Sequence, residues 1–178
     1  MKKFFDHIKK SQQKIIILIF VSFSLFVGIT IGETWDEGYH LKHGKVTFNY
    51  LMSFGRINEN LDFRDQYSSI YFTIQYFFSN FFPKKYTVES VHVLNLILSW
   101  ATLFGLSKIC KIFFNKNVGK ISFIVLFLYP VFFGHMSING KDTVLAFCHI
   151  WITYYALRYM KFHFIELKKN KYLIFIGI

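Results

Sequence analysis

Adjacent carboxylates followed by histidines form the first place in this sequence where chemistry could occur. Asp36 and Glu37 stand in the segment GETWDEGYHLKHG, and His40 and His43 follow them at helical spacing. In a helix, positions 36 and 40 share a face, as do positions 37 and 40, so a carboxylate would lie beside an imidazole. Such a pair can act as a general base or supply ligands to a divalent cation.

The same segment also has a structural interpretation that needs no chemistry. Thr34 to Glu37 matches the S/T-x-x-E capping box, in which the two side chains satisfy backbone N–H groups at a helix start. Trp35 and Tyr39 would then be aromatic anchors at a membrane surface. The spacing leaves both alternatives open, a helix cap and a functional acid.

A second group of polar residues lies in YPVFFGHMSINGKDTVLAF, residues 129–147. Asn139 can cap the helix that follows, and Asp142 would then complement the positive end of the helix dipole. Alternatively, Asp142 can bind a metal or orient an acceptor, with His135 and Lys141 beside it to meet a phosphate. These alternatives also stay open.

The elements that would carry these residues are long and uncharged. Hydrophobic residues make up 53% of the 178 residues and charged residues 17%, below the roughly 25% of a soluble domain. A helix of roughly 20 apolar residues crosses a bilayer. We expect membrane-spanning helices at about 15–31, 91–114, 118–135 and 143–161, and an incomplete one from 172. No small-x-small cleavage site follows the first, which favours an uncleaved anchor over a signal peptide.

The basic residues indicate which ends of these helices face the cytoplasm. Residues 1–14, 108–120 and 158–171 together carry 14 basic and 2 acidic side chains, whereas the rest of the chain carries 7 basic and 8 acidic ones. An excess of Lys and Arg marks cytoplasmic loops. We therefore expect a membrane protein with a cytoplasmic N-terminus and both polar segments outside. The net charge of +11 is then a topology signal, and no nucleic-acid partner is expected.

A further apolar segment, residues 66–82, does not fit as a span. If it crossed, the lysine-rich turns that follow would face outward. Gln75 and Asn80 interrupt it, and its tyrosines prefer the headgroup level. We predict an interfacial or re-entrant helix here. The whole, residues 1–178, is expected to be one all-α membrane domain, a polytopic transmembrane bundle with an interfacial helix in its first outer loop.

Other polar residues and motifs point to no separate chemistry. His92 and Asn95 fall within an expected span, where an interhelical hydrogen bond is the common use of such side chains. Cys110 and Cys148 are lone residues in apolar helices, where cysteine behaves as a small hydrophobe. The sequence contains no phosphate-binding glycine loop, C-x-x-C pair or G-x-S-x-G elbow.

The order of these features resembles the N-terminal module of the C-type membrane glycosyltransferases (family 39-like). The closest group within it is the bacterial relatives of protein O-mannosyltransferases and of lipid A aminoarabinose transferases. TWDEGYH resembles their first-loop Asp-Glu motif, and residues 129–147 resemble a P-x-F-F-G-H…N-P-K-D stretch. Gly140 stands where that stretch has proline, a departure expected to loosen the turn.

The resemblance implies an enzyme that transfers a sugar from a polyprenyl-phosphate donor to an acceptor on the outer face. Asp36 matches the general base on the acceptor hydroxyl, with Glu37 in support. Asp142 matches the acid that positions a divalent cation or the donor phosphate, with His135 and Lys141 as substrate-binding residues. The implied partners are the lipid-linked donor and membrane lipids. The candidate metal ligands are Asp36, Asp142 and His40.

The alternatives are a non-catalytic polytopic membrane protein and an inactive truncated remnant. Transporters place polar groups near the bilayer midplane on broken helices, whereas the spans expected at 15–31 and 118–135 are nearly free of such groups. A helix from Tyr172 has seven residues and reaches roughly 10 Å, a third of the bilayer. We therefore expect the front part of a longer protein, with the remaining donor-binding residues beyond position 178.

Overall fold

The computed structural model describes residues 2–56 and 69–161, and every regular element in these stretches is helical. The all-α expectation is thus confirmed for this part of the chain. The incomplete span expected from 172 and most of the basic segment 158–171 lie outside the described residues. The helices are α1 (Lys2–Thr30), α2 (Glu37–Met52), α3 (Ser69–Ser79), the 3-10 turn η2 (Lys84–Tyr86), α4 (Thr87–Phe113), α5 (Lys116–Leu128), α6 (Pro130–His135) and α7 (Gly140–Lys161).

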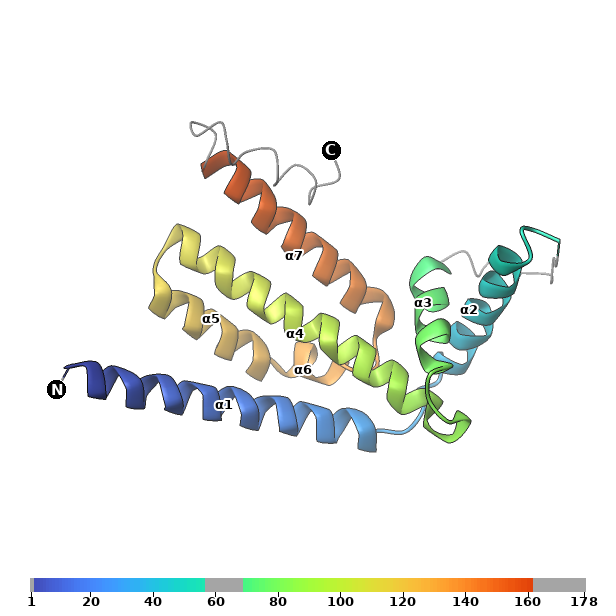
Figure 1. Cartoon of the computed structure of the whole chain (residues 1–178), viewed down its shortest axis with the longest axis horizontal. Coiled ribbons are helices and arrows are strands. Elements are labelled where there is room, and N and C mark those ends of the chain that lie inside the picture. The colour runs from blue at the N-terminus through green and yellow to red at the C-terminus, as the bar shows by residue number, and fades with distance from the viewer. Residues whose placement is uncertain (1, 57–68, 162–178) are drawn as a thin grey trace.

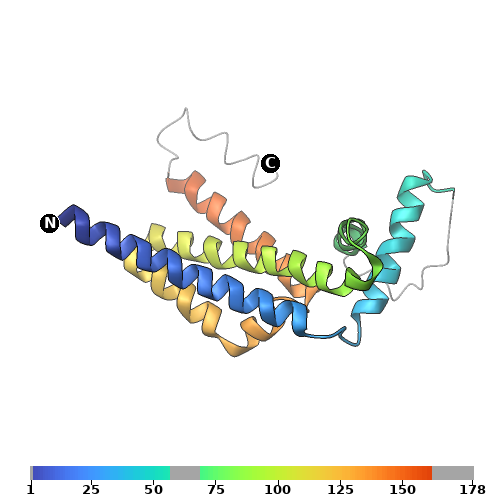
Figure 2. The same cartoon turned by 60° about the horizontal axis from the view of Figure 1, so that its bottom comes forward.

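Helix α4 is the centre of the arrangement. It contacts α1, α3, α5 and α7, and the two views show α1 and α5 running beside it (Figures 1 and 2). Helices α2 and α3 pack on each other at the end of α4 where that helix begins (Figure 1). The first loop and the α6–α7 turn both reach this end, which brings the two polar segments of the sequence to one place.

Two of the described helices are long and apolar enough to cross a membrane. They are Gln12–Thr30 within α1 and Lys84–Phe113, which comprises η2 and α4. The interfacial segment expected at 66–82 contains α3, an 11-residue helix packed on α2. Length and composition are the basis of this membrane assignment.

A continuous helix over the span expected at 118–135 is not present, because the chain breaks there into α5 and α6. Tyr129 between them is extended, with φ −67° and ψ 115°. Pro130 follows as the first residue of α6. Proline has no N–H to continue the helix, its ring collides with the carbonyl four residues earlier, and it disfavours helical geometry in the residue before it.

Close contacts at small residues join the helices of this bundle. A Cβ atom added at Gly105 of α4 would overlap Ile150 of α7, and one added at Gly44 of α2 would overlap the backbone of Phe72 in α3. Between α4, α5 and α6 lies an apolar core that includes Trp100 and Phe127. Phe20 of α1 stacks on Phe127, with 4.4 Å between ring centroids. The missing side chains at Gly105 and Gly44 therefore allow these helices to approach one another closely.

Candidate active site

Asp36 lies at the end of the first loop, immediately before α2. It is the N-cap residue of that helix, but its side chain makes no capping hydrogen bond and is 44% exposed. Its Oδ2 lies 3.5 Å from Nε2 of His40 and 4.0 Å from Nζ of Lys141 at the start of α7. The expected shared face of positions 36 and 40 is present, and an ammonium group from a distant helix joins the pair.

A pocket of about 260 Å³ brings together both polar segments of the sequence. The first loop and α2 contribute one wall, and the α6–α7 turn contributes the other. Most of the site residues expected from the sequence line it, namely Asp36, His40, His135, Lys141 and Asp142. Glu37 is the exception. The pocket thus contains carboxylates, imidazoles and an ammonium group within one small space.

Glu37 points into the protein interior instead. It is 4% exposed, and both of its oxygens are engaged. Oε2 accepts the backbone N–H of Thr34 at 2.6 Å, and Oε1 lies 2.7 Å from Nε2 of His92. Half of the expected capping box is therefore present. The other half is missing, because Oγ1 of Thr34 has no hydrogen-bond partner among the described residues.

Asp142 and Asn139 form a reciprocal cap at the start of α7. The Asn139 side chain accepts the backbone N–H of Asp142 at 3.1 Å and donates to its Oδ2 at 2.7 Å. This is the capping arrangement considered for the sequence. The cap thus engages one oxygen of the exposed Asp142 carboxylate, which lines the pocket.

His40 is a buried imidazole that lines the same pocket. Its ring stacks on Phe72 of α3 with 4.2 Å between centroids, and Nε2 is buried without a hydrogen-bond partner. Burial lowers the pKa of His40, and Lys141 acts in the same direction, against the opposing effect of Asp36. Burial also lowers the pKa of His43. Both rings are therefore neutral near pH 7.

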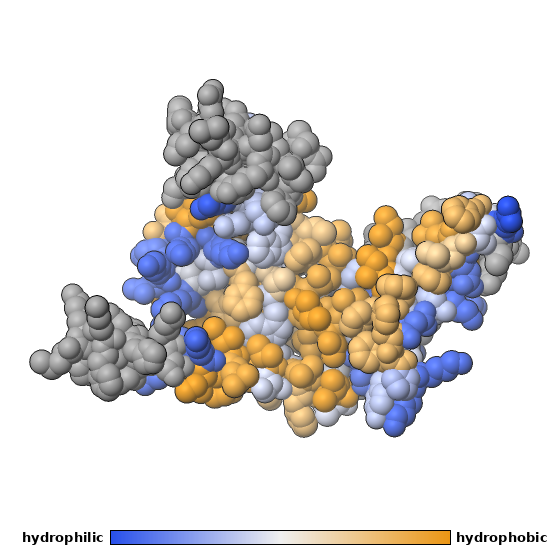
Figure 3. Space-filling view, in the orientation of Figure 1, coloured by the Kyte–Doolittle hydropathy of each residue, from blue (hydrophilic) through white to orange (hydrophobic). Residues whose placement is uncertain are grey.

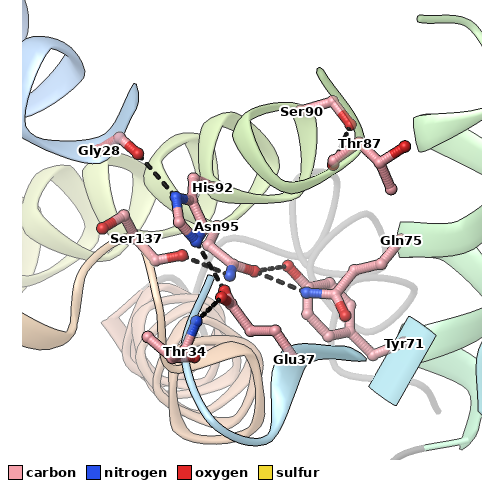
Figure 4. Close-up of polar contacts among 10 residues, drawn as sticks. All are labelled: Gly28, Thr34, Glu37, Tyr71, Gln75, Thr87, Ser90, His92, Asn95 and Ser137. Carbon is pink, nitrogen blue, oxygen red and sulfur yellow. Dashed lines mark hydrogen bonds and ion pairs between the residues drawn. The ribbon is translucent and has the colours of Figure 1, made fainter. Parts of the chain in front are cut away.

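The polar residues of α4 hold this end of the molecule together, as Figure 4 shows. Asn95 accepts the hydroxyl of Tyr71 at 2.6 Å and the amide of Gln75 at 2.9 Å, and it donates to the carbonyl of Ser137 at 2.6 Å. The expected interhelical bonding of His92 and Asn95 is thereby confirmed. Sequence reasoning missed Tyr71 and Gln75 as partners. The signal for them was a glutamine four residues after a tyrosine, a spacing that puts both side chains on one face of α3.

Gly140 occupies the tightest point of this contact. A Cβ atom there would lie 2.7 Å from Nε2 of Gln75 and 3.2 Å from Cε1 of Tyr71. Gly140 is also the first residue of α7. Gly140 therefore allows α7 to pack closely on α3.

A second pocket, of about 380 Å³, lies next to the first. His135, Asn139 and Asp142 line both pockets. The other walls are mostly apolar and come from α4, α5, α6 and α7, for example Leu126, Val131 and Ala146. A polar pocket thus adjoins a mostly apolar one, and three residues line both.

The described part of the chain shows no cluster of metal-binding side chains around Asp36. Within residues 2–56 and 69–161, no group of three or more His, Cys, Asp or Glu side chains is placed to hold an ion. The positive charge nearest Asp36 is the ammonium of Lys141. Divalent cations are bound by convergent oxygen or imidazole ligands, and an ammonium group repels them. The expected cation stays a prediction.

Comparisons with known proteins identify no relative of this chain. No family model matches the chain, and neither the curated proteins nor the solved structures contain a significant match to it.

Proposed function

We propose that this chain is a membrane glycosyltransferase, or the part of one that carries the acceptor base. It would transfer a sugar from a polyprenyl-phosphate donor to an acceptor at the outer face of the bacterial inner membrane. The observation that carries the proposal is the pocket in which Asp36 of the first loop meets Lys141 and Asp142 of α7. The resemblance of the two sequence motifs to those of C-type glycosyltransferases supports the same assignment.

Asp36 is the general base in this scheme. A hydroxyl is a poor nucleophile, so its proton must be removed as the new bond forms. The acceptor O–H proton passes to the half-exposed carboxylate of Asp36 while the acceptor oxygen bonds to the anomeric carbon of the sugar. The bond from that carbon to the phosphate oxygen breaks, and its electron pair leaves with the polyprenyl phosphate.

Lys141 and the start of α7 stabilise the departing phosphate. The ammonium group supplies a full positive charge, and the N-terminal end of a 22-residue helix adds backbone dipoles of the same sign. Groups already fixed in place before reaction stabilise developing charge most effectively. His135, on the wall shared by both pockets, is placed to contact the same phosphate.

The adjoining apolar pocket suits the lipid chain of such a donor. A polyprenyl phosphate has a charged head directly attached to a hydrocarbon chain, and His135, Asn139 and Asp142 line both pockets. Apolar chains leave water favourably for an apolar surface. A soluble sugar nucleotide would have no use for the second pocket.

The surface of the long helices supports a polytopic arrangement in lipid. Leu18 of α1 is 64% exposed and Phe26 is 61% exposed, whereas Ser99 of α4 is buried. Figure 3 shows apolar residues over the middle of the visible face. Soluble proteins rarely expose so large an apolar area. We propose that α5–α6 and α7 also lie within the bilayer, with the N-terminus cytoplasmic and the pocket outside.

Release of polyprenyl phosphate tests the proposed function. The full chain in native membranes is supplied with a panel of polyprenyl-phosphate sugars, and release of the lipid phosphate is measured. Release by the unaltered protein and its loss in Asp36→Asn are expected. Lys116→Ala, which removes a lysine at the start of α5, is the matched control and should be unaffected. Equal release by Asp36→Asn and the unaltered protein would overturn the assignment, and absence of release with every donor would favour a non-catalytic membrane protein.

A further inference from the structure

We propose that the buried side chains of His92 and Asn95 on α4 form a positioning clamp. Their hydrogen bonds fix the first loop (residues 31–36) and the α6–α7 turn (residues 136–139) relative to each other. In this proposal Glu37 belongs to the clamp and takes no part in proton transfer. The inference rests on the proposed function for the roles of Asp36 and Lys141. Residues 92 and 95 are three apart in a helix, so their side chains leave the same face of α4.

The first arm of the clamp runs through His92 to the first loop. His92 is fully buried, and its Nδ1 lies 2.6 Å from the carbonyl oxygen of Gly28 at the end of α1. Because a carbonyl oxygen can only accept, Nδ1 carries hydrogen and donates. Nε2 meets Glu37, whose other oxygen accepts the N–H of Thr34. The chain is thus fixed on both sides of Asp36, whose own carboxylate stays accessible.

The contrast between the two adjacent acids assigns their roles. Both Glu37 oxygens are engaged in a site that is almost closed to solvent. An acceptor hydroxyl cannot reach them without breaking a buried hydrogen bond, which is costly. Asp36 has no cap bond and lines the pocket. Of these two adjacent acids, Asp36 is therefore the one placed to receive a proton.

The second arm runs through Asn95 to the α6–α7 turn. Asn95 is 1% exposed, and its amide donates to the carbonyl of Ser137, three residues before α7 begins. Its oxygen accepts from Tyr71 and Gln75 of α3. This one side chain therefore ties α3 and the turn that leads into α7 to α4. Its loss would leave several buried polar groups unpaired at once.

Together the arms determine how far apart the reacting groups lie. Asp36 Oδ2 and Lys141 Nζ are 4.0 Å apart, although they come from opposite sides of α4 in the sequence. Hydrogen bonds are directional, so a buried network favours one arrangement of the segments it joins. The clamp sets the first loop and α7 against the same turn of α4, and the spacing in the pocket follows from it.

A distance measurement on the full chain tests the clamp without any substrate. Spin labels are placed at Trp35→Cys, beside Asp36, and at Leu145→Cys, one turn into α7. Both native side chains are exposed, at 99% and 61%. Cys110 and Cys148 are first replaced by Ser so that only the two introduced thiols react.

Ser107→Ala is the matched control for loss of an α4 side-chain bond. Ser107 donates to the carbonyl of Gly119 at 2.6 Å, at the opposite end of α4 from the pocket. The unaltered protein and this control should give one narrow distance. His92→Ala and Asn95→Ala should lose it. Asn95→Asp, which keeps the size and the acceptor oxygen but has no N–H for Ser137, should also lose it and replaces Asn95→Ala if that variant does not fold.

Two substitutions at Glu37 distinguish a positioning role from a role in proton transfer. In Glu37→Gln the amide oxygen can still accept from Thr34, and the amide N–H can donate to a neutral His92 ring. This variant should keep the narrow distance and the release of polyprenyl phosphate, whereas Glu37→Ala should lose both.

Narrow distances in both His92→Ala and Asn95→Asp would overturn the clamp. Loss of lipid-phosphate release in Glu37→Gln with an unchanged distance would overturn the role of Glu37. Because the distance needs no donor, failure of the proposed function and failure of the clamp give different results.

Discussion

The two ends of the α4–α7 pair each contain a lysine, and the two lysines meet opposite surroundings. At the α5 end, Nζ of Lys108 lies 4.8 Å from the ring centroid of Trp151 and 5.4 Å from that of Tyr154. At the other end, Nζ of Lys141 lies 4.0 Å from the carboxylate of Asp36, at the wall of a pocket. Ring faces hold a cation without leaving a reactive group beside it, whereas an accessible carboxylate next to an ammonium can take part in a reaction.

This difference shows that residue type alone does not distinguish a packing role from a functional one. Lys108 joins two helices, since its ammonium group covers aromatic rings of α7 from its position on α4. Lys141 contributes to a space that a ligand can enter. We therefore expect changes at the Lys108 end to alter stability and changes at the Lys141 end to alter chemistry.

The largest expected effect concerns Asp36, the carboxylate of the pocket end. Asp36→Asn keeps the shape but cannot accept a proton, so lipid-phosphate release should fall about 100-fold or more. The melting temperature should stay within error of the unaltered value, because the side chain makes no cap bond. A matching fall in melting temperature would mean that Asp36 is structural and would remove the contrast between the two ends.

Next in size is the effect of a larger side chain between α4 and α7 near the Lys108 end. Gly105→Leu introduces atoms where a Cβ alone would already overlap Ile150. Overpacking of this kind costs about 1–3 kcal/mol of the free energy of unfolding. Thermal unfolding in detergent, followed by tryptophan fluorescence, measures it. Gly134→Ala, where an added Cβ meets nothing within 4 Å, serves as the control.

A smaller effect is expected for Lys108 itself. Lys108→Ala removes an exposed cation from two aromatic rings, which should cost about 0.5 kcal/mol of the free energy of unfolding. Lipid-phosphate release, measured well below the melting temperature, should be unchanged. Reduced release at unchanged stability would show that both ends of the helix pair serve the reaction.

The smallest effect is a pH dependence of stability from His40. The pKa of His40 is lowered in the folded protein from its ordinary value of 6.5, chiefly by burial. The unfolded chain therefore binds a proton first as the pH falls, and stability should be complete above pH 6.5 and decrease below it. Melting temperatures between about pH 5 and 7.5 measure this loss. His40→Gln should flatten the profile, and an unchanged slope in that variant would assign the loss to other groups.

Sequence patterns predicted much of the fold and the meeting of the polar segments, but not the bonds between them. The uncharged runs predicted α1 and α4, since length and hydropathy depend on local composition. Pro130 contained the signal for the break between α5 and α6, which the run of apolar residues concealed. The sequence could not predict that Asp36 lines the pocket while Glu37 is buried. The path of the loop over α4 determines where each of these neighbouring side chains points.

Binding of a phosphate head group next to Lys141 is the most direct test of the central claim. The full chain in nanodiscs is titrated with a polyprenyl phosphate, and the phosphorus NMR signal is followed, with the corresponding polyprenol as the uncharged comparison. The proposed site predicts a saturable shift with the unaltered protein and with Lys108→Ala, and its loss in Lys141→Ala. The same shift in Lys141→Ala as in Lys108→Ala would contradict a phosphate site in this pocket.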